Sequence, residues 1–231
     1  MASKNILSII LMLISFASFA QEKSLNSWVT GTINKQVHNW DFDIEFEYRS
    51  IGVFEKLNRF SIQPEIDYNF SKFVKLGMSY SIMSVYDSKY DDYQWRNRYA
   101  ILSEGRLKSG RFTLKLREKF ELTTKDESDR IRDNGEIDTY RINPDVVWRN
   151  KLKISYNVPN IPIEPAIAFE SFYQLNNPGV NVFEKLRYSL FLGYKVAKKQ
   201  EIEIFSHLNN EITNPESIKT YVVGIGYNYS L

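Results

Sequence analysis

Most of the chain alternates between apolar and polar residues with a period of two, which is the pattern of a β-strand with two different faces. In residues 40–50 the apolar face carries Trp40, Phe42, Ile44, Phe46 and Tyr48, and the polar face carries Asp41, Asp43, Glu45, Glu47 and Arg49. The same alternation is clear in 59–70, 73–86, 111–123, 183–196 and 221–231, and weaker in 93–107, 140–156, 161–175 and 201–209. No helical period appears after the first twenty residues, so the sequence predicts an all-β protein.

The connections between these segments alternate in length. Brief turns fall at 38–39, 71–72, 108–110, 157–160 and 197–200, and longer polar loops at 51–58, 87–92, 124–139, 176–182 and 210–217. Short turns at one end and long loops at the other are typical of an outer-membrane barrel, with the turns in the periplasm and the loops outside.

Alternation by itself also fits a soluble barrel, whose apolar face points inward and can hold an apolar ligand. Three features favour the membrane barrel. The segments match the 9–11 or so residues that cross a bilayer obliquely, aromatic residues such as Trp40, Phe70 and Tyr86 gather near segment ends, and the chain ends inside its last segment. We therefore expect an antiparallel transmembrane β-barrel, with a soluble periplasmic barrel as the alternative.

The strand number is predicted as 10–12. Ten segments fit between 40 and 231, and Trp28 to Val37 forms an eleventh. Because bacterial barrels usually have even strand numbers, we expect either ten strands or, by a slight preference, twelve.

Four residues do not fit regular membrane strands. Glu118 falls on the apolar face, and a β-bulge there would turn it inward. Pro64, Pro144 and Pro165 fall in the middle of predicted strands, where each removes a hydrogen-bond donor.

The first twenty residues have the pattern of a cleaved secretory signal. Lys4 is positive, residues 6–16 are apolar, and Ser18-Phe19-Ala20 suits cleavage before Gln21. A membrane anchor would need about 20 apolar residues. We expect a signal peptide at 1–20 and a single barrel domain at 21–231.

Charge and composition exclude several classes of protein. Lys and Arg number 30 against 28 Asp and Glu, so the chain lacks the positive excess of a nucleic-acid-binding protein. The absence of cysteine excludes disulfides, a thiolate metal site and a cysteine nucleophile.

The polar face carries both signs of charge. Acids cluster at 41–47 and 65–67, and the predicted basic wall consists of Arg96, Arg98, Arg106, Arg111, Lys115, Arg117, Lys119, Arg141, Arg149 and Lys151. Facing one another across a lumen, these groups would form a salt-bridge network that fills the barrel. Alternatively, the basic wall would favour anions in a narrow channel. The cargo of such a channel is not identified by the sequence.

Catalytic candidates are few. His38 lies in a short turn, whereas His207 points inward, with Ser189 opposite it and Glu170 beyond Ser189. A catalytic triad needs the histidine between the serine and the acid, so this order favours ordinary packing. A protein without enzymatic activity is expected, with a lipid-modifying hydrolase as the alternative.

Acidic residues gather in the predicted loops. They are Asp87, Asp91, Asp92, Asp126, Glu127, Asp129, Asp133, Glu136 and Asp138. Their spacing differs from that of an EF-hand, so we expect solvated loops and assign no metal, cofactor or catalytic residue.

Several segments together resemble an uncharacterised envelope family, domain of unknown function 2490. The resemblance is carried by Trp28, the 42–49 strand, Arg96-x-Arg98-Tyr99, the 112–120 strand with Arg117-Glu118, and the 165–170 segment before Phe172. It implies an outer-membrane barrel with no assigned activity, so no catalytic residue is transferred.

The last residues are similar to the aromatic final strand that the barrel-assembly machinery recognises. Tyr227-x-Tyr229-x-Leu231 differs from that signal in its terminal leucine, where Phe or Trp is usual. The expected partners are therefore this machinery, outer-membrane lipid and lipopolysaccharide.

Overall fold

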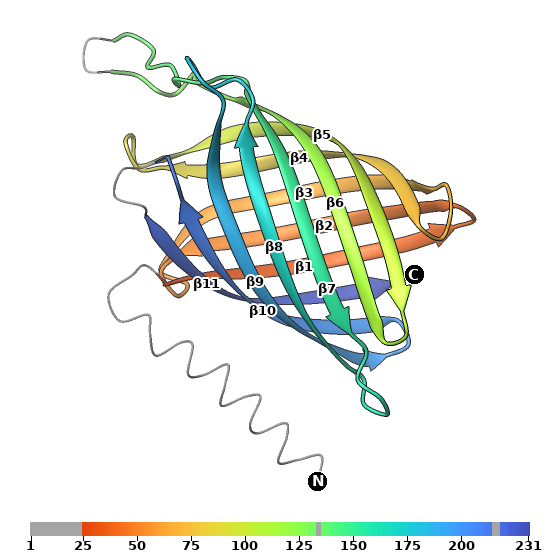
Figure 1. The fold of residues 1–231 in the computed structure, drawn as a ribbon. Coiled ribbons are helices and arrows are strands. Elements are labelled where there is room, and N and C mark those ends of the chain that lie inside the picture. The colour runs from red at the N-terminus through yellow and green to blue at the C-terminus, as the bar shows by residue number, and fades with distance from the viewer. Residues whose placement is uncertain (1–24, 133–134, 214–217) are drawn as a thin grey trace.

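The computed structural model describes residues 25–132, 135–213 and 218–231, which form a closed barrel of eleven strands (Figure 1). The predicted signal peptide at 1–20 and its cleavage point before Gln21 lie outside the described residues. In chain order the strands are β1 (Leu25–Val37), β2 (Trp40–Ile51), β3 (Lys56–Asn69), β4 (Val74–Asp87), β5 (Asp92–Ser109), β6 (Phe112–Lys125), β7 (Asp145–Tyr156), β8 (Ile163–Gln174), β9 (Val182–Ala197), β10 (Gln200–Glu211) and β11 (Lys219–Ser230). No helix among the described residues is long and apolar enough to cross a membrane.

The slight preference for twelve strands is wrong, and the reason is visible at the barrel seam. Successive strands pair antiparallel, but β1 and β11 pair in parallel, from Leu25 opposite Tyr221 to Asn34 opposite Ser230. When the number of alternating strands is odd, the first and last strands run in the same direction. The barrel therefore closes without a twelfth strand.

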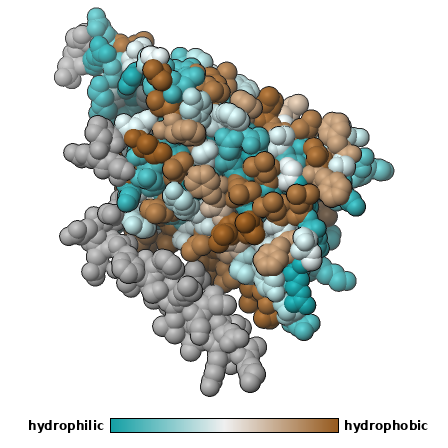
Figure 2. Space-filling view, in the orientation of Figure 1, coloured by the Kyte–Doolittle hydropathy of each residue, from teal (hydrophilic) through white to brown (hydrophobic). Residues whose placement is uncertain are grey.

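The apolar faces of the strands point outward. On β2 and β5, Phe42, Ile44 and Ile101 are 43%, 44% and 63% exposed, whereas Asp67 and Glu170 inside the barrel are 0% and 3% exposed. Figure 2 shows hydrophobic side chains gathered mostly over the middle of the visible face, with hydrophilic ones towards its ends. A soluble barrel would have the opposite polarity, so that alternative is inconsistent with the structure.

The irregular positions behave differently from one another. Pro64 lies in β3 and Pro165 in β8, as predicted, but the placement of Pro144 within a strand is wrong because β7 begins at Asp145. On the β4 side, β3 pairs at Ile62 and again at Glu65, so the ladder skips Pro64, which has no N–H to donate.

The bulge predicted at Glu118 is also wrong. The register is regular on both sides of this residue, from Ser103 on β5 through Glu118 to Asn150 on β7. The side chain of Glu118 therefore stays on the outer face of the barrel, between the exposed Leu116 and Phe120.

An apolar cluster lies inside the barrel beside the seam. Trp28, Phe205 and Val222 are buried there, with Phe191 packed against them. Gly224 lies opposite Phe205 in the register, and a Cβ at Gly224 would come 2.2 Å from the Phe205 ring. The phenylalanine ring thus occupies the space that the missing side chain leaves open.

This contact predicts that Gly224→Ala destabilises the barrel, because the ring must move within a packed cluster. Overpacking of this kind costs about 1–3 kcal/mol. The matched control is Gly31→Ala, since a Cβ at Gly31 would meet nothing within 4 Å. Unfolding in urea can be monitored by the mobility of the unboiled protein on a gel. The urea concentration at the midpoint should be lower for Gly224→Ala than for the wild type, and for Gly31→Ala it should stay near the wild-type value. Equal midpoints would contradict the packing argument.

Candidate functional site

The candidate site is a cavity of about 250 Å³ in the middle of the barrel interior. Eight basic and four acidic side chains contribute to its wall. They are Arg49, Arg59, Arg98, Arg117, Lys119, Arg149, Lys151 and Arg187, and Glu45, Glu47, Glu170 and Glu203. Glu65 and Glu121 form ion pairs with Arg117 and Arg149. Lys153 in turn pairs with Glu203 of the wall, so with these three groups included the basic side chains outnumber the acidic ones by three.

Arg149 on β7 is the centre of the densest group of ion pairs. Its Nη1 lies 2.7 Å from Glu121 Oε1 on β6, and its Nη2 lies 2.6 Å from Glu170 Oε1 on β8. Arg187 on β9 approaches the other oxygen of Glu170 at 3.3 Å. Because both carboxylates are buried, these contacts supply the pairing that buried charge requires.

A second group surrounds Glu47 on β2. Its carboxylate accepts hydrogen bonds from Arg49 at 2.7 Å and from Arg59 on β3 at 2.5 Å. The Arg49 guanidinium lies 3.6 Å from the centre of the Trp28 ring, which Arg187 also approaches at 5.1 Å. The indole thus contacts cations from β2 and β9, a favourable contact for an electron-rich ring.

Three ion pairs between described residues join strands that are not neighbours and so cross the interior. Arg117 on β6 pairs with Glu65 on β3, Lys119 on β6 approaches the same carboxylate at 3.9 Å, and Lys153 on β7 pairs with Glu203 on β10 at 3.3 Å. The prediction of opposed acidic and basic walls is confirmed where Arg117 pairs with Glu65, whereas Lys153 and Glu203 lie outside the predicted walls. The contacts also narrow the lumen.

The membership of the basic wall differs from the predicted one. Arg111 lies in the turn before β6 and Arg141 in the loop before β7, so neither belongs to a strand. Arg49, Arg59 and Arg187 contribute instead. Each of these three arginines occupies a polar position of an alternating segment. The alternation is therefore the sequence signal that identifies them as residues of the interior wall.

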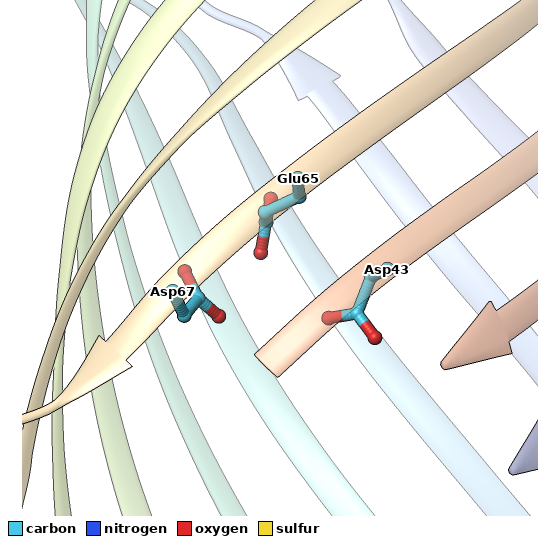
Figure 3. A group of neighbouring side chains, drawn as sticks. All are labelled: Asp43, Glu65 and Asp67. Carbon is cyan, nitrogen blue, oxygen red and sulfur yellow. The ribbon is translucent and has the colours of Figure 1, made fainter. Parts of the chain in front are cut away.

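Three carboxylates from β2 and β3 lie close together towards the end of the barrel with the short turns. One oxygen each of Asp43, Glu65 and Asp67 lies within 4.8 Å of the others (Figure 3). Lys75 already pairs with Asp67, and Arg117 with Glu65. We therefore assign these acids to the charge network and not to a metal site.

The pairing of Ser189 with His207 is confirmed. The two residues are opposite one another on β9 and β10, and His207 Nδ1 lies 2.9 Å from Ser189 Oγ. Among the described residues, however, no hydrogen bond joins a carboxylate to His207, and Glu170 accepts from Arg149 and Arg187. The imidazole packs against the rings of Phe205 and Trp28, with centroids 4.8 and 5.1 Å away. The acid that would orient a catalytic histidine does not reach it.

The loop between β6 and β7 docks on the turn between β4 and β5. Arg130 is buried, pairs with Asp87 and with Asp138 at 3.1 Å, and lies 3.9 Å from the Tyr140 ring. Lys89 and Arg132 approach Asp138 at 2.7 and 2.6 Å. Hydrogen bonds from Lys89 and Arg132 hold the pKa of Asp138 well below its ordinary value of 3.8. These loop acids pair with basic side chains, and the predicted loop residue Asp133 lies outside the described residues.

This docking predicts that Asp138→Asn releases the loop, so that trypsin cleaves after Arg130 and Arg132 several-fold faster. Because the pKa of Asp138 is lowered, its stabilising effect is fully present above the ordinary aspartate pKa and is lost only as the pH falls through the lowered value. Asp129→Asn is the control, since Asp129 is exposed on the same loop. Equal cleavage rates for the two variants would contradict the docking.

Comparison with known proteins gives the family. Residues 25–217 match a family model described as "Protein of unknown function (DUF2490)", which covers all but the last of the eleven strands. The chain belongs to this family. The match extends over the barrel strands and so confirms the resemblance inferred from the sequence.

The fold is similar to that of a solved porin. A structure of the NanC porin aligns with a TM-score of 0.51 and 10% sequence identity, covering 89% of this chain and 98% of the porin chain. At this identity the likeness concerns the fold alone. No curated protein matches the chain in sequence.

Proposed function

We propose that the protein is exported by its signal peptide, inserts in the outer membrane and forms a narrow channel that prefers anions. The observation that carries the proposal is the central cavity with its excess of basic side chains. Rings of Arg and Lys favour anions because they replace part of the hydration that the anion loses on entering. The exposed apolar outer face and the porin-like fold support insertion in a membrane.

The first test concerns the membrane barrel itself. Protein extracted from the outer-membrane fraction should migrate differently on a gel with and without boiling, because a closed barrel resists detergent until it is heated. Protein that is free in the periplasm, without a heat-dependent shift, would overturn the proposal.

The second test concerns conduction. Purified protein in a planar bilayer with a KCl gradient should give small currents, since ion pairs such as Lys153–Glu203 narrow the lumen. The reversal potential should lie on the chloride side of zero. A reversal potential on the potassium side would contradict the assignment of the basic wall.

A barrel that carries no current would favour the second candidate function, a structural barrel filled by its own salt bridges. The specific observation in its favour is the group around Arg149, in which buried charges are already paired with one another. Conductance separates the two functions, because ions pass through the central cavity of a channel and do not pass through a barrel filled by its own side chains.

A further inference from the structure

A polar group lies on the outer face of the barrel, where the neighbouring side chains are apolar. Four residues follow one another in register across β5, β6, β7 and β8: Ser103, Glu118, Asn150 and Ser171. We call these four residues the outer polar row. On each of the four strands, the residue two positions away from the row is an exposed hydrophobic residue on the same outer face. These residues are Ile101, Phe120, Leu152 and Phe169.

Glu118 is held in a defined position at the centre of this row. The indole N–H of Trp148 donates to Glu118 Oε2 at 2.7 Å, and the Trp148 ring is stacked on Phe120 with centroids 5.5 Å apart. With the amide oriented to suit its neighbours, Asn150 donates to both oxygens of Glu118, at 3.0 Å for Oε1. The carboxyl group is thus fixed on the outer wall and does not turn towards the lumen.

The depth of this group decides what can contact it. Glu118 lies halfway along β6 and Asn150 halfway along β7, so in the proposed outer-membrane barrel both lie near the middle of the bilayer. Acyl chains fill that depth and carry no hydrogen-bond donors or acceptors. A carboxylate has about four acceptor positions, of which Trp148 and Asn150 use part. Lipid cannot satisfy the remainder, whereas another membrane protein can.

A second copy of this chain fits best, because a two-fold axis along the membrane normal keeps every residue at its own depth. The Ser103–Glu118 pair of one copy then meets the same pair of the other, so that each hydroxyl donates to the opposite carboxylate. Both amide hydrogens of Asn150 already donate to Glu118, so Asn150 offers only its carbonyl oxygen, and Glu118 offers its remaining acceptor position. The donor is the hydroxyl of Ser103, which lies opposite Glu118 in the register, whereas Ser171 is buried. A face with both kinds of group is complementary to itself, as a two-fold interface requires.

We infer that the protein forms a two-fold dimer through β5–β8, with the outer polar row at the interface. The inference rests on the membrane location proposed above and not on conduction. Polar groups at this depth commonly join membrane segments, since their alternative is contact with hydrocarbon.

The test is the mass of the purified protein in lipid nanodiscs, measured by light scattering. The wild type should have twice the mass of one chain, and Glu118→Leu should be monomeric. Leucine on the lipid face does not threaten folding, and retention of the heat-dependent gel shift shows that the variant is folded. A monomeric wild type, or a Glu118→Leu variant that stays dimeric, would overturn the inference.

The chain offers a matched pair of controls. Ser103 is in the row, whereas Ser206 faces outward on β10, two strands beyond the last strand of the row, between Leu190 and Val223 in the register. Ser103→Leu should weaken the dimer, and Ser206→Leu should leave it unchanged.

The absence of cysteine makes a second measurement possible in isolated membranes. A short bis-maleimide should join two copies of Ser103→Cys and should not join copies of Ser206→Cys. Cross-linking of both variants, or of neither, would contradict the assigned interface. Absence of the protein from the outer-membrane fraction would instead contradict the proposed function, so the two failures are distinguishable.

Discussion

Replacing Arg149 with methionine is expected to destabilise the barrel by about 3–5 kcal/mol, which is the usual effect of breaking a buried ion pair on one side. Arg149 contacts Glu121 at 2.7 Å and Glu170 at 2.6 Å, and both carboxylates are buried. Without the guanidinium, each acid keeps only longer contacts, such as Arg98 to Glu121 at 3.6 Å and Arg187 to Glu170 at 3.3 Å. The midpoint of urea unfolding in detergent measures the effect.

Two further variants test the physical reason. Lys153→Met removes a single, partly exposed pair with Glu203, so its effect should lie within about 1 kcal/mol. Adding Glu121→Gln and Glu170→Gln to Arg149→Met should not recover the lost stability, because Arg98 and Arg187 then lose their acidic partners. If Arg149→Met unfolded like the wild type, the interior carboxylates would have to be solvated by water that enters the lumen.

The second large effect is expected on ion selectivity. Lys151 lies on the cavity wall opposite Glu170 in the register. Among the described residues, no carboxylate oxygen lies within 4.0 Å of the Lys151 ammonium group. The charge of Lys151 is therefore available to a passing ion. Lys151→Glu changes the charge of the wall by two, which removes most of the excess of three basic groups around the cavity. The reversal potential in a KCl gradient should therefore move from the chloride side to near zero.

The matched control is Lys72→Glu, which makes the same change of charge in the exposed turn between β3 and β4. Its reversal potential should equal that of the wild type. If Lys151→Glu had no effect on a conducting barrel, the path of the ions would avoid the central cavity. If both variants shifted the potential equally, the selectivity would arise from the overall surface charge.

Much of the barrel could be predicted from the sequence because a strand that separates two environments must alternate between them. Trp40 to Tyr48 show the apolar face and Asp41 to Arg49 the polar one, and the structure places them outside and inside the barrel. The candidate cavity follows the same rule, since its basic residues occupy polar positions of alternating strands.

Other features depend on contacts between distant segments and could not be predicted in this way. Alternation does not say which strand closes the barrel, and β1 pairs with β11 across almost the whole chain. It gives the face of Glu118 correctly but does not show that Trp148 and Asn150 would satisfy the carboxyl group there, which makes a bulge unnecessary.

The sequence by itself determined the all-β class, the approximate strand positions, the two faces and the family resemblance, because these depend on residues near one another in the chain. Only the tertiary structure decided the strand number, the parallel seam, the ion pairs across the lumen and the partners of Glu170. Those features depend on register and side-chain geometry among strands that are distant in sequence. Such contacts form only when the barrel closes.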